Sequence, residues 1–270
     1  MTLMKLSAVY AVTVDETGFD IVIRGGLGEA LDLLSRLGYG GVEYNVANPF
    51  KVDVMALGRE AEERGLGVAA ISTGLSYLTY GYSLSDRSGE SRGKAIEFFK
   101  RYMDIAVELG AGKVVVGLAR GKGGEEREEA LKRLRDSLRK LDEYASEKGV
   151  LLVLEPLNRY ETDLVNRFDE ALEIAESLRN VRILLDTFHA TLEEPSVYDL
   201  IPRLAGMIGH VHVSDSNRLA PGMGILDWER IIYRLAKSGY RGYLSVEART
   251  EPSYKAMLEK SAETLLPLLM

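Results

Sequence analysis

The fold of this chain is decided by four short segments: VLLVLE (150–155), VRILLD (181–186), IGHVHV (208–213) and GYLSVE (242–247). Each is rich in Val, Leu or Ile, is bounded by turn signals and alternates with a stretch of helical periodicity. Runs of this kind are typical of buried parallel strands. At or near the C-terminal end of each run stands an ionisable residue: Glu155, Asp186, His212 and Glu247. Such a side chain must face either the core or a functional site.

The same pattern covers the rest of the chain. Strand-like runs occur near residues 5–14, 41–46, 67–73, 112–118, 150–155, 181–186, 208–214 and 242–247. Helical periodicity is found near residues 27–37, 52–65, 88–109, 124–148, 168–178, 197–206, 227–238 and 254–268. Eight strand–helix units in about 250 residues predict the α/β class and a single-domain (β/α)8 TIM barrel over residues 1–270. A doubly wound open sheet is the alternative, but no G-x-G-x-x-G follows the first run and no P-loop is present.

The composition is that of a soluble enzyme and argues against several other classes. The 46% hydrophobic and 28% charged content is ordinary for a globular protein. A net charge of −7 argues against a nucleic-acid partner, because nucleic-acid binders normally carry a basic face. No run approaches the roughly 18 apolar residues that a membrane span needs. The chain has no cysteine, so disulfides, thiolate ligands and a cysteine nucleophile are excluded, and we expect a cytoplasmic protein.

In a barrel of this type the C-terminal ends of the strands meet at one mouth. The four ionisable residues then come from the last four strands, one from each. A single carboxylate there would suit a helix cap or an ion pair. Four in register are harder to explain in that way, because buried charges are costly unless paired or bound to a metal, and the strand ends carry no basic residue. Three carboxylates and one imidazole favour Mn²⁺, Mg²⁺ or Co²⁺ over a structural zinc, and we expect Mn²⁺.

Other ionisable residues near these strand ends have two interpretations. His210 lies two residues before His212 on the same strand face, and we expect it to be a hydrogen-bonded core residue rather than a ligand. Glu161, His189 and Arg218 fall in predicted loops. Their spacing alone fits either a contact with a substrate or a solvated side chain.

Four longer segments together resemble a family of sugar-converting enzymes. They are LEPLNRYE (154–161), LLDTFHA (184–190), HVHVSDSNR (210–218) and PGMGILDW (221–228). The chain resembles the D-tagatose 3-epimerase and D-psicose (allulose) 3-epimerase family of the xylose isomerase-like TIM barrel superfamily. The resemblance implies that the four strand-end residues hold the metal and that Glu155 and Glu247 also form the acid/base pair. It further implies that Glu161, His189 and Arg218 contact the first carbons of the substrate and their oxygens.

The implied activity is a metal-dependent ketose 3-epimerase that acts on free ketoses such as D-tagatose, D-psicose, D-fructose or ketopentoses. Removing the proton next to a carbonyl leaves a cis-enediolate, whose charge a divalent cation stabilises. One glutamate takes the proton from one face and the other returns a proton to the opposite face. The alternatives are a sugar or hydroxypyruvate isomerase that moves hydrogen between C1 and C2, and an inosose-type dehydratase.

Two further classes fit the sequence less well. An apurinic endonuclease shares the barrel but needs a multi-zinc site, whereas this chain has only three histidines and a net negative charge that repels DNA. A non-catalytic sugar-binding barrel does not need both a set of metal ligands and two candidate bases.

The size and phosphorylation of the substrate stay open. By the resemblance, Tyr10, Thr73 and Gly117 correspond to positions that contact the far end of the sugar. The resemblance places Arg218 near the reacting carbons, so we expect a free sugar. Arg120 and Lys122 could meet a distal phosphate, but we expect a solvated loop there. The resemblance also implies a homodimer or homotetramer.

Overall fold

The strands of this protein close into one parallel barrel. The computed structural model describes residues 4–12 and 20–269. Its strands are β1 (Lys5–Val12), β2 (Gly41–Val46), β3 (Gly67–Ser72), β4 (Lys113–Val116), β5 (Leu151–Leu154), β6 (Val181–Asp186), β7 (Ile208–Val213) and β8 (Tyr243–Val246). Each pairs with the next in sequence, and β8 pairs with β1, where Ser245 lies opposite Ser7. The predicted (β/α)8 barrel is confirmed, while residues 13–14, expected to end the first strand, lie outside the described residues.

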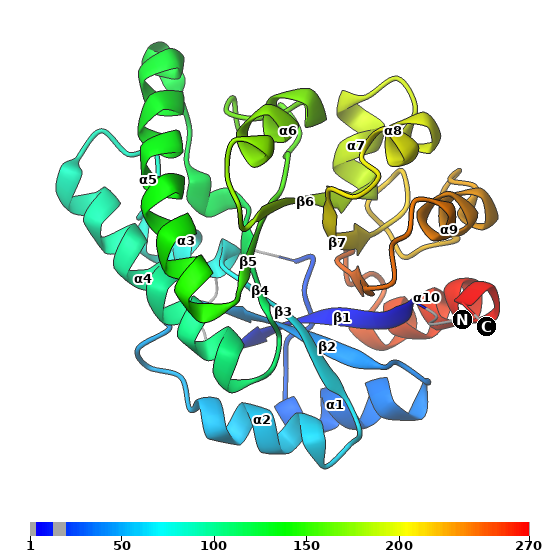
Figure 1. The fold of residues 1–270 in the computed structure, drawn as a ribbon. Coiled ribbons are helices and arrows are strands. Elements are labelled where there is room, and N and C mark those ends of the chain that lie inside the picture. Colours follow the sequence, from blue (N-terminus) through cyan, green and yellow to red (C-terminus); the bar gives the residue numbers. More distant parts are fainter. Residues whose placement is uncertain (1–3, 13–19, 270) are drawn as a thin grey trace.

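The predicted helices lie around the outside of the strands (Figure 1). They are α1 (Leu27–Arg36), α2 (Val54–Glu62), α4 (Gly89–Glu108), α5 (Arg127–Lys148), α6 (Phe168–Glu176), α8 (Val197–Arg203), α9 (Trp228–Lys237) and α10 (Tyr254–Leu269). Local signals set their ends. Asp53 caps α2 by accepting a hydrogen bond from the amide of Ala56, and Gly149 ends α5 in the left-handed conformation at φ 67°. Within the described residues, no helix is both long and apolar enough to cross a membrane.

The sequence pattern does not predict two short helices, α3 (Gly74–Tyr80) and α7 (Thr187–Glu193). Asp186 ends β6 and also caps α7, because its Oδ1 accepts a hydrogen bond of 2.8 Å from the amide of His189. His189 therefore lies in the first turn of a helix, and the expectation of a loop there is wrong. Helix α7 begins directly after the last residue of β6, so no turn signal marks its start in the sequence.

The alternation of side chains along each strand decides which residues face the interior of the barrel. In β5, Leu154 packs in the large core that includes the helices, whereas Val153 belongs to a small cluster formed by strand residues alone. Glu155, the next residue, therefore turns toward the interior again. The same rule turns the polar residues at the C-terminal ends of β6, β7 and β8 inward.

Candidate metal centre and active site

Three acidic side chains and one imidazole meet at the C-terminal mouth of the barrel. Glu155 follows β5, Asp186 ends β6, His212 lies in β7 and Glu247 follows β8. One possible ligand atom from each lies within 4.8 Å of the others, and all four side chains are buried. His212 Nδ1 is 3.5 Å from Glu155 Oε1 and 3.5 Å from Glu247 Oε2. The structure thus brings together the four residues that the strand ends singled out.

Two atoms of this cluster that could bind a metal lack a hydrogen-bond partner. Glu155 Oε1 and His212 Nδ1 are buried, and no partner for them is found among the described residues. Buried polar atoms are normally hydrogen-bonded, so these two atoms call for a partner of another kind. Three carboxylates and an imidazole form a donor set that Mn²⁺, Mg²⁺ and Co²⁺ accept. The residues therefore fit a divalent metal site.

Without a cation the cluster is electrostatically unfavourable. Burial raises the pKa of Glu155, and burial together with the charge of Glu155 raises the pKa of Asp186 to about 7. Burial alone would lower the pKa of His212, but the carboxylates of Glu43 and Glu247 outweigh burial and raise this pKa well above its usual value. Protons thus neutralise part of the negative charge, and a divalent cation that binds there displaces them.

A buried arginine lies beside the cluster. Arg120 follows β4 in a short 3₁₀ turn (Leu118–Arg120), is fully buried, and donates from Nη1 to the backbone carbonyl of Glu155. Burial lowers the pKa of Arg120 to about 10, although the charges of Glu155 and Glu161 oppose this change, so the guanidinium stays charged at neutral pH. The expectation of a solvated loop is wrong for Arg120, because its side chain packs against the backbone after β5. Lys122 is exposed, as expected.

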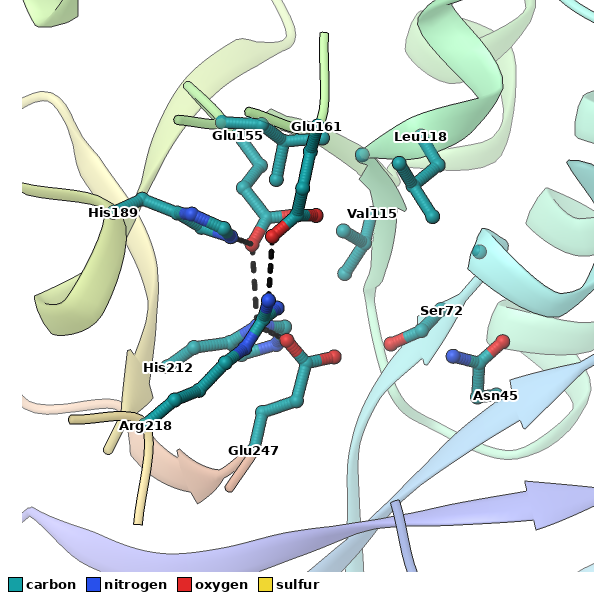
Figure 2. A pocket seen from close by; sticks show the side chains of 13 residues that line it. Asn45, Ser72, Val115, Leu118, Glu155, Glu161, His189, His212, Arg218 and Glu247 are labelled. Atoms are coloured by element: carbon teal, nitrogen blue, oxygen red, sulfur yellow. Dashed lines mark hydrogen bonds and ion pairs between the residues drawn. The ribbon is translucent and has the colours of Figure 1, made fainter. Parts of the chain in front are cut away.

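Glu161, His189 and Arg218 lie next to the cluster (Figure 2), and Asn158 links His189 to the other two. Arg218 Nη1 forms an ion pair with Glu161 Oε1, which also accepts a hydrogen bond of 2.9 Å from Asn158 Nδ2. Asn158 Nδ2 lies 2.8 Å from His189 Nδ1. His189 Nε2 is in turn 3.9 Å from Glu155 Oε1. One chain of contacts therefore runs from Arg218 to the carboxylate of Glu155.

The backbone of Arg218 adopts a conformation that non-glycine residues rarely take, with φ 62°. Its amide donates to the carbonyl of Asp215 at 2.8 Å, and its own carbonyl accepts from the amide of Arg249 at 2.7 Å. Its guanidinium lies over the ring of Phe188, 5.0 Å from the centroid. The loop thus holds this side chain in place, and such enforced conformations are concentrated at functional sites.

The cavity at this mouth also contains residues that the sequence analysis missed. Asn45 and Ser72, at the ends of β2 and β3, line it together with the residues described above. Strand alternation could have found Asn45, because it places a polar residue on the inner face of an apolar strand. Of the three positions expected at the far end of the sugar, Gly117 lines the cavity. Tyr10 and Thr73 instead donate their hydroxyl hydrogens to backbone carbonyls.

A family model described as a xylose isomerase-like TIM barrel matches residues 31–268, and this chain belongs to that family. Within the family the chain is similar to D-psicose 3-epimerase from Enterocloster bolteae, with 32% identity over 241 residues that cover 80% of this chain and 75% of the relative. It is also similar to 3-dehydro-D-guloside 4-epimerase from Escherichia coli, with 29% identity over 215 residues that cover 74% of this chain and 81% of the relative.

The solved structures agree with these relatives. The structure of an L-ribulose 3-epimerase superposes with a TM-score of 0.84 at 25% identity and covers 99% of this chain and 95% of that one. The predicted resemblance to ketose 3-epimerases is therefore confirmed. The chain is a member of a sugar epimerase family and carries a buried Glu, Asp and His cluster of the metal-site type.

Proposed function

We propose that this protein is a metal-dependent ketose 3-epimerase acting on free ketoses, such as D-psicose, D-tagatose, D-fructose or ketopentoses. The observation that carries the proposal is the pair Glu155 and Glu247. Their side chains enter the cavity from opposite sides (Figure 2), and each places an oxygen 3.5 Å from His212 Nδ1. Inverting a carbon centre needs a proton-transfer group on each face, and two opposed carboxylates meet that need. The ketose 3-epimerase relatives support the same reaction.

Glu155 and Glu247 take and return the proton at C3. The carboxylate on one face removes the proton, and the carboxyl group on the other face delivers one to the opposite side. A divalent cation held by Glu155, Asp186, His212 and Glu247 would stabilise the negative charge that develops on the substrate oxygens. The handedness of the substrate decides which glutamate acts first.

His189 can donate a hydrogen bond to a substrate oxygen. Both the side-chain Nδ2 and the backbone amide of Asn158 face its Nδ1, at 2.8 and 3.3 Å, and both can only donate. Nδ1 is therefore the acceptor, and Nε2 carries the hydrogen. Burial, with the charge of Arg218 adding to it, holds the pKa of His189 well below its usual value, so the imidazole is neutral. Its Nε2 has no hydrogen-bond partner among the described residues and lies at the cavity.

The ion pair of Arg218 and Glu161 supplies further contacts for the oxygens at the reacting end of the sugar. Burial would lower the pKa of Arg218, but the nearby carboxylates of Glu161 and Glu247 raise it. The guanidinium therefore stays charged and can donate to a substrate hydroxyl or carbonyl, while Glu161 can accept from a hydroxyl. Positioning of this kind aligns the C3 hydrogen with a glutamate.

The proposal is tested by incubating the Mn²⁺-loaded protein with a panel of free ketohexoses and ketopentoses and separating the products by chromatography. We expect C3 epimers of at least one sugar and no product after treatment with EDTA. Aldose formation would instead assign a C1–C2 isomerase, and a dehydrated product from inososes would assign a dehydratase. A panel without any converted sugar would contradict the proposal.

The similarity to 3-dehydro-D-guloside 4-epimerase supports a second candidate. In a 3-keto sugar the carbonyl lies at C3, so the same pair of glutamates would exchange the proton at the neighbouring C4. The two candidates share the chemical step and differ in where the substrate carries its carbonyl group. Adding 3-keto glycosides to the panel separates them, because conversion of these sugars alone would favour the 4-epimerase.

The identity of the metal, the oligomeric state and the cellular location are further parts of the proposal. Mn²⁺ is our preferred metal for the donor set, with Mg²⁺ and Co²⁺ as alternatives. We propose a homodimer or homotetramer located in the cytoplasm. Light scattering on the purified protein measures the oligomeric state directly, and a monomer would contradict this expectation.

A further inference from the structure

A second cluster of polar side chains lies inside the barrel, next to His212 and away from the substrate contacts. Its centre is Glu43 in β2, which is fully buried. Glu43 Oε1 lies 3.0 Å from His212 Nε2, and Glu43 Oε2 lies 2.7 Å from His210 Nε2. The hydroxyl of Ser72 also donates to Glu43 Oε1. None of the roles assigned above uses this carboxylate.

We propose that Glu43 is a positioning residue that fixes the tautomer and the ring orientation of His212 for metal binding. A neutral imidazole carries its hydrogen on one nitrogen and its lone pair on the other. A carboxylate 3.0 Å from Nε2 retains the hydrogen on that atom. The lone pair is then on Nδ1, which faces Glu155 and Glu247 and has no hydrogen-bond partner in the described part of the chain.

Neighbouring side chains hold the carboxylate itself in place. His210 contacts one of its oxygens and Ser72 contacts the other, so the carboxylate is bound from β7 and from β3. His210 Nε2 is also 3.1 Å from Ser245 Oγ, which lies 2.6 Å from Ser7 Oγ. His210 is therefore the hydrogen-bonded core residue that its spacing predicts. A buried carboxylate with these contacts has little freedom to rotate, which is what orienting a metal ligand requires.

Glu43, His210 and His212 could also be considered as a separate metal site, since their donor atoms lie close together. The hydrogen bonds argue against that. In this cluster the Nε2 atoms and the carboxylate oxygens satisfy one another, so the atoms that could share a metal are already paired. Among the described residues His210 Nδ1 has no partner, but it is His210 Nε2 that contacts Glu43. Glu155 Oε1 and His212 Nδ1 also have no partner, and these two atoms lie 3.5 Å apart. The metal would therefore bind at His212 Nδ1 and Glu155 Oε1, on the cavity side of His212. Glu43 contacts the other ring nitrogen, Nε2.

The inference rests on the metal centre of the proposed function and not on the identity of the sugar. Its first test is the Mn²⁺ affinity of the metal-stripped protein, measured by electron paramagnetic resonance of free Mn²⁺. The variants are Glu43→Gln and, as a control, Ser7→Ala, which removes hydrogen bonds from the same buried layer without touching Glu43. We expect Glu43→Gln to weaken Mn²⁺ binding by roughly 10- to 100-fold and Ser7→Ala by less than about threefold.

The second test uses the wild-type protein and is independent of how the variants fold. The chain has only three histidines, so long-range ¹H–¹⁵N spectra of ¹⁵N-histidine-labelled protein resolve each ring. In the Mg²⁺-loaded protein we expect His212 to carry its hydrogen on Nε2. A hydrogen on Nδ1 would overturn the inference, because Nε2 would then face the metal.

The outcomes separate the inference from the proposed function. Wild-type-like Mn²⁺ affinity in a folded Glu43→Gln protein would overturn the role of Glu43 and leave the epimerase proposal standing. Absence of Mn²⁺ binding by the wild-type protein would overturn both the metal centre and the role of Glu43. Tight Mn²⁺ binding that depends on Glu43, found in a protein that converts no sugar, would support the inference and contradict only the epimerase.

Discussion

The alternation of side chains within single strands explains why few polar residues suffice to build this site. Val153 and Ser245 face the interior of the barrel. Glu155 and Glu247 follow them by two residues, so their side chains point to the same side. These positions could be predicted from the sequence because each carboxylate ends an apolar run. Glu43 was not predicted because it lies within an apolar run and not at its end. A carboxylate inside an apolar strand is nevertheless a signal of a hydrogen-bonded or functional side chain.

Replacement of either proposed acid/base residue should stop the reaction. In Glu155→Gln and Glu247→Gln an amide cannot exchange the proton, so we expect turnover to fall by at least about 100-fold at saturating Mn²⁺. The measurement is the initial rate of C3 epimer formation, with circular dichroism to verify the fold. Glu176→Gln, on the exposed side of α6, is the control and should retain full activity. Normal rates in either active-site variant would remove that residue from the mechanism.

A side chain at position 117 should displace the carboxylate of Glu155, which lies next to Gly117. An added Cβ would lie 2.5 Å from Glu155 Oε2, closer than real contacts allow, so the carboxylate would have to move. We expect Gly117→Ala to lower both turnover and Mn²⁺ affinity while the melting temperature changes little, since the displaced atom is the end of a side chain. Gly93→Ala is the matched control, because nothing lies within 4 Å of its added Cβ. Equal activity of the two variants would contradict the position of Glu155.

At the scale of the elements, the segments after the strands are the part that the sequence pattern describes least well. The helix α7 begins on Asp186, so one residue serves as strand end, cap and candidate ligand, and His189 follows on the first turn. No turn signal separates this helix from β6, so the sequence does not show where it begins. The inward turn of Arg120 could not be predicted either, because it depends on contact with the distant backbone of Glu155.

The loop after β7 is organised by one carboxylate, Asp215. It accepts hydrogen bonds from three backbone amides and from one indole: Ser216, Gly222, Leu226 and Trp228. An asparagine cannot accept all of them, so we expect Asp215→Asn to lower the free energy of unfolding by about 1–3 kcal/mol in urea denaturation. It should also raise KM, because this loop holds Arg218. Unchanged stability would show that the loop does not depend on Asp215.

The stability contributed by Asp215 should depend on pH. Burial alone would raise the pKa of Asp215, but the hydrogen bonds from Trp228 and the backbone amides outweigh burial and hold this pKa below its usual value. A lowered folded-state pKa gives stability that is present above the unfolded value of about 3.9 and is lost as the pH falls through the folded value. The difference in stability between wild-type protein and Asp215→Asn should therefore shrink below about pH 4.

At the scale of the whole molecule, strand and helix periodicity was enough to predict a closed eight-stranded barrel and to bring four distant residues to one mouth. Those residues are spread over a segment of 93 residues, from Glu155 to Glu247, and only the closure of the barrel brings them together. The shape of the cavity and the preferred sugar are not encoded in that periodicity, because they depend on loop side chains such as Arg218 and Leu118.

Metal removal should destabilise the whole protein. Cations that bind only the folded state add stability, about 2.7 kcal/mol at a concentration 100 times the dissociation constant. We therefore expect EDTA-treated protein to unfold at a lower temperature, and added Mn²⁺ to restore the melting temperature in a concentration-dependent way. Differential scanning calorimetry measures the effect. A melting temperature that does not respond to Mn²⁺ would contradict a metal centre at this mouth.

In the proposed reaction two opposed glutamates exchange the proton at C3 of a ketose. The most direct measurement is NMR of the sugar after the Mn²⁺-loaded protein has been incubated with its preferred ketose in D₂O. We expect deuterium at C3, appearing together with the C3 epimer and missing in Glu155→Gln and Glu247→Gln. Deuterium at C1 or C2 with formation of an aldose, or epimer formed without any deuterium at C3, would contradict the proposed reaction.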